Sequence, residues 1–451
     1  MRRLLILCCL APLALPAAAL ASHSQITSFE APRDLLNPSS RASALNQISG
    51  FGVGALRVIL YWQDVAPTPA ASRAPSFNQA DPNAYNWATY DAIIDGARAK
   101  GLRVLLTVSG PVPRWATLAR RDRVTHPDPA RFGLFMQAVA KHYASRIPMF
   151  SIWNEPNHPD FLKPQYFRGK PASGEWYRKL FLAGYHGLVK GGIAHPQVLM
   201  GETAPVGTGH DLAPLTFMRQ ALCLNASYHH TSRCAKLPVA GYAHHAYTKA
   251  AGPYYVPPGR NDVTIGVLSR LTSALDRAGR AGAIPRNLPV YLTEFGIQSV
   301  PDPIYGVSQQ RQAEFQAISE RIAYNNPRVK WFSQYLLRDD THKTTGPVFA
   351  RYPGFESGLR FANGKPKLSL RAFPVPLSAL RTGGRVSLWG LARPAHTRTQ
   401  VTILVRGKRY LTLATDARGY FTKRVPYVRG RAYQLRWQGH TGPPTRVYTR
   451  P

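Results

Sequence analysis

Eight short runs of β-forming residues alternate with longer amphipathic stretches between Gln25 and Phe373, and this alternation constrains the fold more than any other feature. Runs rich in β-branched and aromatic residues predict strands, whereas apolar residues that recur every three or four positions predict helices buried on one face. The predicted strands are residues 25–30, 56–61, 103–107, 150–154, 197–201, 241–244, 289–293 and 329–336. The clearest predicted helices are residues 85–100, 128–147, 174–191, 263–281 and 308–325.

Eight strands separated by helices predict a parallel sheet, and eight is the number that closes a (β/α)8 barrel. The alternative is an open, doubly wound sheet, which needs a glycine-rich phosphate loop after its first strand. Residues 30–33 read Glu-Ala-Pro-Arg and contain no glycine. The sequence therefore predicts an α/β fold built on a TIM barrel.

The pattern changes after Pro376, where short alternating runs replace the helical period. Such runs lie at residues 386–390, 401–405 and 433–437, and a turn-forming Asp-Ala-Arg-Gly segment separates two of them. Short alternating runs with turns between them are typical of a small antiparallel β-sandwich. We therefore expect a catalytic barrel at residues 22–375 and an accessory domain at 376–451.

The first 21 residues have the three parts of a secretory signal peptide. Arg2 and Arg3 are basic, Leu4–Leu15 is apolar, and Ala19-Leu20-Ala21 is a small-x-small cleavage site. We therefore expect a secreted protein, extracellular or associated with the cell envelope, with no transmembrane segment in the mature chain.

Two cysteines remain in the mature chain, Cys223 and Cys234. In an exported protein such a pair favours a disulfide. His229 and His230 lie between them and leave a metal site as the alternative, but the spacing of zinc ligands is absent. We expect the disulfide and no metal.

The chain carries 57 Lys+Arg against 23 Asp+Glu, a formal net charge of +34. No zinc-finger, helix-turn-helix or aromatic RNA-binding pattern accompanies this charge, so a nucleic-acid partner is not expected. The excess is densest in residues 376–451, which hold fifteen basic residues and one acid, Asp416. Our hypothesis is that this domain tethers the protein to an anionic cell-envelope polymer.

Two glutamates follow predicted strands at positions where a barrel builds its active site. Glu155 follows the fourth strand and Glu294 follows the seventh. The carboxyl ends of barrel strands meet at one mouth, so both side chains should face the same space. Cleavage of a glycosidic bond needs one proton donor and one carboxylate, and this pair could supply both.

The sequences around these glutamates resemble the catalytic signatures of the clan A glycoside hydrolases, especially the cellulase-like family 5 and family 39. The runs are Trp-Asn-Glu-Pro-Asn at 153–157 and Leu-Thr-Glu-Phe-Gly at 292–296. The resemblance implies that Glu155 is the acid/base, that Asn154 binds the sugar 2-hydroxyl, and that Glu294 is the nucleophile.

Three further residues are similar to the clan's pattern. Arg57 resembles an arginine that keeps the nucleophile ionised, because a guanidinium lowers the pKa of a neighbouring carboxylate. The run Ala-His-His-Ala-Tyr at 243–247 is similar to a His-x-Tyr motif, which makes His245 and Tyr247 candidates to contact the sugar and the nucleophile. Without the resemblance, His244 and His245 could equally be one core and one surface residue.

The sequence also departs from the family 5 pattern. Residues 109–115 lack the histidine expected after the third strand, which moves the likeness towards family 39 or an outlying branch. Trp331 lies near the start of the eighth strand, whereas the tryptophan that stacks on the sugar normally lies near its end. The candidates for that platform are Gln334, Tyr335, Trp62 and Trp115.

The sequence thus predicts a secreted, retaining glycosidase that cleaves β-linked bonds of an oligo- or polysaccharide by double displacement, without a cofactor. The alternative is a carbohydrate-binding or cell-wall-associated barrel with weak catalysis. The missing histidine and displaced tryptophan favour that alternative, whereas the two glutamates and Asn154 favour the enzyme.

Overall fold

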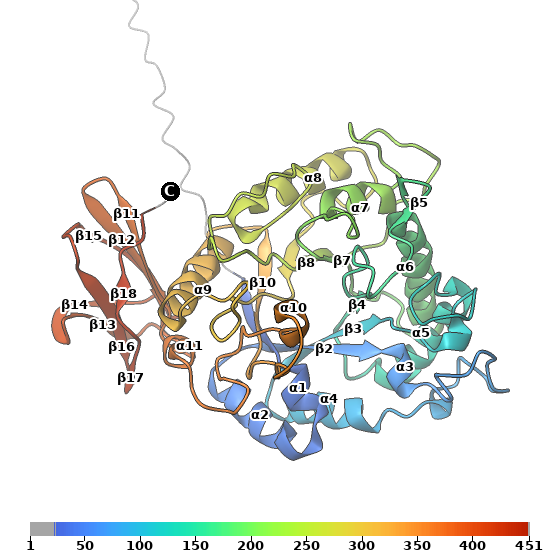
Figure 1. Cartoon of the computed structure of the whole chain (residues 1–451), viewed down its shortest axis with the longest axis horizontal. Helices are drawn as coiled ribbons and strands as arrows, with labels where there is room; N and C mark the ends of the chain where they lie inside the picture. Colours follow the sequence, from blue (N-terminus) through green and yellow to red (C-terminus); the bar gives the residue numbers. More distant parts are fainter. Residues whose placement is uncertain (1–21, 23, 450–451) are drawn as a thin grey trace, which may run out of the picture.

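The computed structural model describes residue 22 and residues 24–449, and in it eight parallel strands close into a barrel (Figure 1). Around the barrel the strand order is β1-β10-β9-β8-β7-β4-β3-β2. The strands are β1 (Ile26–Glu30), β2 (Ala55–Tyr61), β3 (Arg103–Ser109), β4 (Met149–Ile152), β7 (Val198–Thr203), β8 (Gly241–His244), β9 (Val290–Leu292) and β10 (Val329–Tyr335). The predicted (β/α)8 barrel is confirmed. The predicted signal peptide lies outside the described residues.

Helices surround the barrel, and the five predicted ones are present. They are α4 (Ala88–Ala99), α5 (Pro129–Tyr143), α6 (Ser173–Lys190), α8 (Leu268–Arg280) and α9 (Gln309–Tyr324). The start of α5 shows why the sequence forms a helix there, because the Asp128 carboxylate accepts from the Ala130 N–H at 2.9 Å and Pro129 occupies the first turn. Further helices include α1 (Pro32–Leu36), α2 (Pro38–Gly50), α7 (Pro214–Ala221), α10 (Val348–Arg351) and α11 (Leu368–Ala372).

Side chains fill the lower part of the barrel interior. Ala55, Leu105, Leu199, Ala243 and Trp331 form one buried cluster from strands around the ring. Packed layers of this kind close a TIM barrel below its mouth. Trp331 therefore belongs to the floor of the barrel, which explains why it lies at the start of its strand.

The C-terminal region forms antiparallel sheets around its own core, as predicted. One sheet contains β11 (Leu377–Thr382), β12 (Arg385–Leu391) and β15 (Tyr420–Pro426). The other contains β13 (Gln400–Val405), β14 (Lys408–Ala414), β16 (Ala432–Trp437), β17 (His440–Thr441) and β18 (Thr445–Arg446). Their inner faces bury Val386, Leu388, Ile403, Val425, Tyr433 and Leu435. We call this region the β domain.

The β domain is docked on α9 at the side of the barrel (Figure 1). The Arg393 Nη2 donates to both oxygens of Glu320 at 2.8 and 2.9 Å, in a buried ion pair. The ring of Tyr420 stacks on that of Tyr324 with centroids 4.3 Å apart. This interface combines apolar, aromatic and charged contacts.

The β domain also holds the residues that precede β1. Arg418 donates to the backbone oxygens of Ser22 and Gln25 at 2.7 and 2.8 Å. The Ser22 N–H donates to the Tyr324 oxygen, and its hydroxyl donates to the Val329 oxygen at the start of β10. Because β1 pairs with β10, these contacts lie along the seam at which the barrel closes.

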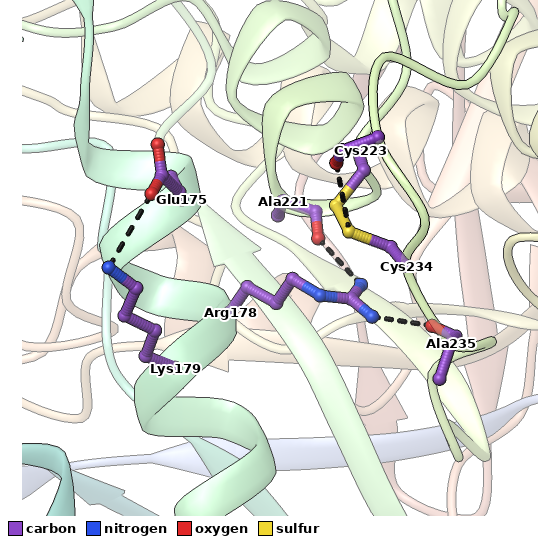
Figure 2. The surroundings of a disulfide bond; sticks show 8 residues. Glu175, Arg178, Lys179, Ala221, Cys223, Cys234 and Ala235 are labelled. Carbon is purple, nitrogen blue, oxygen red and sulfur yellow. Dashed lines mark hydrogen bonds and ion pairs between the residues drawn. A yellow bond between two sulfur atoms is a disulfide. The ribbon is translucent and has the colours of Figure 1, made fainter.

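The expected disulfide between Cys223 and Cys234 is present (Figure 2). Arg178, on α6, reaches across to this segment and donates to the Ala221 and Ala235 oxygens on either side of the bridge. The loop after α7 is thus held by one covalent bond and by hydrogen bonds to a neighbouring helix. In the described part of the chain, no helix has the length and apolar character needed to span a membrane.

Candidate active site

Four glutamates lie at the carboxyl ends of barrel strands. Glu30 ends β1, Glu202 lies near the end of β7, and Glu155 and Glu294 follow β4 and β9. Glu30, Glu202 and Glu294 are buried, and Glu155 is partly buried. The barrel therefore gathers four carboxyl groups at one mouth.

The two glutamates predicted to be catalytic face each other across His245. One oxygen of each carboxylate and one ring nitrogen of His245 all lie within 4.8 Å of one another. The His245 Nδ1 lies 2.8 Å from Glu155 Oε1 and 3.6 Å from Glu294 Oε2. Retaining glycosidases hold their carboxyl groups about 5–5.5 Å apart and inverting ones roughly 6.5–9.5 Å. The nearest oxygens here lie closer together than the inverting range.

An unusual backbone conformation presents Glu155 to the mouth. Trp153 and Glu155 have φ angles of 73° and 38°, in the left-handed region that residues other than glycine rarely occupy. Neighbouring strands hold this turn, because the Asn154 N–H donates to the Ser109 hydroxyl and the Glu155 N–H donates to the Glu202 backbone oxygen, both at 3.0 Å. Strained conformations held in this way cluster at functional sites.

Arg57 links the carboxylates below the mouth and is itself buried. Its Nη1 contacts Glu30 and donates to Glu294 Oε2 at 2.9 Å. Its Nη2 contacts Glu202 and donates to Asn154 Oδ1 at 2.7 Å. The guanidinium therefore provides the positive charge expected beside Glu294. Since Arg57 occupies Asn154 Oδ1, the amide NH2 of Asn154 is the group left for a substrate hydroxyl.

The surroundings of Glu155 favour its protonated form. Burial raises the pKa of the Glu155 carboxyl to about 7; the nearby His158 and Arg57 lower it, and Asp211 and Glu202 raise it. A carboxyl group with this pKa holds its proton near neutral pH and can donate it to a substrate. Such a pKa suits a general acid.

His245 and Tyr247, the candidates to contact the sugar and the nucleophile, lie against the two carboxylates: His245 contacts Glu155 and Tyr247 contacts Glu294. Burial lowers the pKa of His245 to about 4, so the ring is neutral near pH 7. The Tyr247 hydroxyl donates to Glu294 Oε1 at 2.7 Å. Both histidines of the tandem pair are buried: His244 lies 2.9 Å from the Thr203 hydroxyl and 2.8 Å from the Val263 oxygen, and is a core residue.

Glu155 and Glu294 both line one cavity of about 380 Å³. It is lined by Glu30, Pro32, Leu35, Leu36, Arg57, Tyr61, Asn154, Glu155, His158, Asp160, Phe161, Glu294, Tyr335, Pro353 and Phe355, among others. The rings of Tyr335 and Phe355 meet edge to face, with centroids 5.2 Å apart. They form an aromatic wall, and of the four platform candidates Tyr335 is the one that lines the cavity.

The interpretation of Trp62 and Trp115 as sugar platforms is wrong. Their exposed fractions are 0% and 1%, and the Trp62 ring stacks on Phe135 of α5 with centroids 4.9 Å apart. Both indoles pack in the layer between barrel and helices, where a sugar cannot reach them. Gln334 is also buried, and its amide donates to the Ser357 backbone oxygen at 3.1 Å instead of lining the cavity.

The sequence reasoning missed Glu30, Glu202 and Phe355. Glu30 ends one predicted strand and Glu202 directly follows another, so the position that singled out Glu155 and Glu294 applied to them as well. Phe355 lies in the long loop after β10, where no periodic pattern indicates which residue faces the cavity.

Glu155, His245 and Glu294 also offer three donor atoms at a spacing that a metal ion could use. Each donor already has a protein partner, since Glu294 contacts Arg57 and Tyr247 and His245 contacts Glu155. The absence of a metal and of a cofactor stays an expectation from the sequence.

No family model matches this sequence, and no curated protein matches it. Solved structures share its fold. A family 39 glycoside hydrolase from Bacteroides cellulosilyticus WH2 is 15% identical, with 90% of this chain and 79% of that chain covered and a TM-score of 0.52. A glucosidase from Croceicoccus marinus is 11% identical, with 92% and 96% covered and a TM-score of 0.55. GH5_18 from Streptomyces cattleya, solved in complex with GlcNAc, is 14% identical, with 78% and 81% covered and a TM-score of 0.51. The chain thus has the barrel fold of the clan A glycoside hydrolases that its two glutamate motifs resemble.

Proposed function

We propose that this protein is a retaining glycoside hydrolase that cleaves β-linked O-glycosidic bonds of an oligo- or polysaccharide. The observation that carries the proposal is the placement of Glu155 and Glu294 at one cavity, with carboxylate oxygens within 4.8 Å. That spacing suits a double displacement. The names of the structural neighbours, a family 39 hydrolase and a glucosidase, agree with this chemistry.

In the first step, a Glu294 oxygen attacks the anomeric carbon and forms a glycosyl ester. The bond between that carbon and the leaving oxygen breaks, its electron pair stays on the oxygen, and Glu155 supplies the proton. In the second step, Glu155 takes a proton from water, the water oxygen bonds to the anomeric carbon, and the ester bond to Glu294 breaks. The product keeps the β configuration.

The surrounding residues prepare the two carboxyl groups for these roles. The Arg57 guanidinium and the Tyr247 hydroxyl both donate hydrogen bonds to the Glu294 carboxylate. These contacts stabilise the ionised form of the nucleophile. The amide of Asn154 is free to donate to the sugar 2-hydroxyl. Tyr335 and Phe355 offer apolar rings to the face of a sugar.

Replacement of the nucleophile tests this proposal. Glu294→Ala should abolish turnover of an aryl β-glycoside, and external azide should partly restore it by attacking the anomeric carbon in place of Glu294. Glu175→Ala, an exposed glutamate on α6, is the matched control and should keep wild-type activity. Wild-type turnover by Glu294→Ala would contradict the assignment.

A 2-deoxy-2-fluoro glycoside gives a second readout that does not depend on a mutation. Such compounds leave the enzyme trapped as the glycosyl ester, so mass spectrometry should find the added sugar on the peptide that contains Glu294. An unlabelled protein that nonetheless binds oligosaccharides would favour the alternative, a carbohydrate-binding barrel with weak catalysis.

We also propose that the protein is exported and that the β domain holds it to an anionic polymer of the cell envelope. The signal-like N-terminus supports export. Exposed basic side chains support the tether, and they include Arg381, Arg385, Arg406, Lys408, Arg409, Lys423, Arg424, Arg429 and Arg436. Asp416, the one acid of the domain, is occupied in capping the Arg418 and Tyr420 N–H groups.

Retention on a polyphosphate resin tests the tether. We compare a β-domain variant, Arg406→Gln/Lys408→Gln/Arg409→Gln, with a barrel variant of equal charge change, Arg121→Gln/Arg233→Gln/Arg260→Gln, whose three arginines are exposed. The β-domain variant should elute at clearly lower salt than the barrel variant. Equal elution of the two variants would show that the charge of the whole chain, and not the β domain, drives retention.

A further inference from the structure

The catalytic cavity is acidic, although the chain as a whole has a net charge of +34. Four carboxyl groups line it, those of Glu30, Glu155, Asp160 and Glu294. A fifth, Glu202, lies buried directly beneath and contacts Arg57. Acidic groups therefore outnumber basic ones at the cavity, the reverse of the whole chain, and this bears on which sugar the proposed hydrolase accepts.

Each basic side chain that lines the cavity is already paired with carboxylates. Arg57 contacts Glu30, Glu202 and Glu294. The His158 Nε2 lies 3.4 Å from Asp211 Oδ1, and its Nδ1 lies 3.9 Å from an oxygen of Asp160. Among the described residues of the cavity lining, no cation is left to neutralise a negative charge on a substrate.

Glu30 has one carboxyl oxygen with no partner. Its side chain is 2% exposed, Oε2 contacts Arg57, and Oε1 has no hydrogen-bond partner in the protein. A buried polar atom without a partner is costly and is expected to find one. Burial raises the pKa of Glu30 to about 8, with Arg57 lowering it and Glu294 raising it.

The barrel topology places Glu30 away from Glu155, with only β10 between its strand and β9, which Glu294 follows. Glu155, which protonates the leaving oxygen, follows β4, and β2 and β3 separate β4 from β1. Glu30 ends β1 and pairs in register with Tyr335 of β10, which follows β9 around the barrel. A sugar attacked by Glu294 would therefore have Glu30 and Tyr335 on the side away from Glu155.

Building on the proposed hydrolase activity, we propose that Glu30 binds a hydroxyl group of the sugar unit attacked by Glu294 and that this unit carries no negative charge. The Glu30 carboxyl lines the cavity, and its oxygen without a protein partner is the atom to which a sugar hydroxyl would bond. A uronic acid would bring a carboxylate beside those of Glu294 and Asp160, with no free cation to pair with it. The polymer held by the β domain and the sugar bound in the barrel then differ in charge.

Aryl glycosides of matched leaving group test the charge preference on the wild-type protein. We compare 4-nitrophenyl β-glucoside, β-galactoside, β-mannoside and β-xyloside with the β-glucuronide and the β-galacturonide. The best uncharged glycoside should exceed every uronide in kcat/KM by at least about 100-fold, because like charges placed together cost several kcal/mol. A uronide as the best substrate would overturn the inference.

Variants of Glu30 test the contact itself. Glu30→Ala should lower kcat/KM for the best uncharged glycoside by about 10- to 100-fold, the loss expected for one hydrogen bond to a carboxyl group. Glu30→Gln keeps a donor and should recover most of that loss. Glu314→Ala removes a buried glutamate that pairs with Arg446 away from the cavity and should leave kcat/KM unchanged. Unchanged kinetics in Glu30→Ala would overturn the contact.

Binding measured by calorimetry separates this inference from the proposed activity. We compare the affinity for glucose, galactose, mannose and xylose with that for glucuronate and galacturonate. Binding of an uncharged sugar without turnover of any glycoside would support the inference and overturn the hydrolase. Turnover of glucosides and glucuronides at similar rates would overturn the inference and leave the hydrolase standing.

Discussion

Glu155 and Glu294 are chemically identical side chains, and their neighbours make them different. Glu294 contacts a guanidinium and a phenol hydroxyl, from Arg57 and Tyr247, and both stabilise a negative charge. Glu155 contacts the neutral ring of His245 and is mostly surrounded by protein. Different surroundings are how one protein obtains a proton donor and a nucleophile from two carboxyl groups.

The raised pKa of Glu155 predicts a loss of activity in base. A general acid works only while protonated, so kcat/KM should fall as the pH rises through about 7. The charge of Glu202 contributes to that raised pKa. Glu202→Gln should therefore move the basic limb to lower pH, because removing a nearby negative charge stabilises the Glu155 anion. The measurement is kcat/KM for an aryl β-glycoside between pH 4 and 9, and a limb that moves to higher pH would contradict the explanation.

Loss of the Arg57 charge should cost both activity and stability. Arg57→Met leaves buried carboxylates without their cation, and breaking a buried ion pair in this way costs about 3–5 kcal/mol. Urea unfolding should show the loss in the free energy of unfolding. Arg98→Met, at an exposed arginine on α4 that lies near Asp95, is the control and should change it by less than about 0.5 kcal/mol.

At the scale of single residues, the sequence predicted those site residues that lie directly after a strand and within a recognisable motif. Glu155 and Glu294 were predictable because each follows a strand and lies in a recognisable motif. Glu30 and Glu202 also end strands, but without a motif a single acid after a strand is more often a cap or a surface residue. Trp62 was wrongly predicted to stack on the sugar, because an indole at a strand end can equally well pack in the layer between barrel and helix.

At the scale of elements, the strands were predicted to within a few residues because buried parallel strands are continuous apolar runs. Helix α2 was not predicted, since its sequence Pro-Ser-Ser-Arg-Ala-Ser-Ala-Leu-Asn-Gln-Ile-Ser-Gly has few apolar positions and buries only Ala44, Leu45 and Ile48. The short hairpin of β5 (Tyr166–Phe167) and β6 (Lys170–Pro171) was missed as well, because two-residue strands carry no period.

The Cys223–Cys234 bridge makes a prediction about the loop after α7. Removing a disulfide that closes a loop of this size costs about 2–3 kcal/mol through the greater freedom of the unfolded chain. Cys223→Ser/Cys234→Ser should lower the melting temperature, and dithiothreitol should lower that of the wild type to a similar value. Because Arg178 holds the same segment by two hydrogen bonds, activity should remain. An unchanged melting temperature in both experiments would show that the bridge adds nothing.

At the scale of the whole molecule, the interface between barrel and β domain predicts a single unfolding transition. The buried Arg393–Glu320 pair and the stacked Tyr324 and Tyr420 rings couple the two units. Scanning calorimetry should show one peak for the wild type. Arg393→Met leaves Glu320 buried without its cation. This variant should show either two peaks or one peak whose melting temperature is lower by several degrees. Two well-separated peaks in the wild type would contradict the coupling.

The position of the β domain along the seam has a consequence for the order of biosynthesis. β1 is made first, its partner β10 emerges about three hundred residues later, and the contacts of Arg393 and Arg418 that hold α9 and the start of β1 come last. A nascent chain that stops before the β domain would leave the closing strand pair without these contacts, and Tyr324 without the ring that covers it. The strand pair that closes the barrel is therefore stabilised by contacts made only after the β domain has been synthesised, and we expect chains interrupted before this domain to be degraded faster by quality-control proteases.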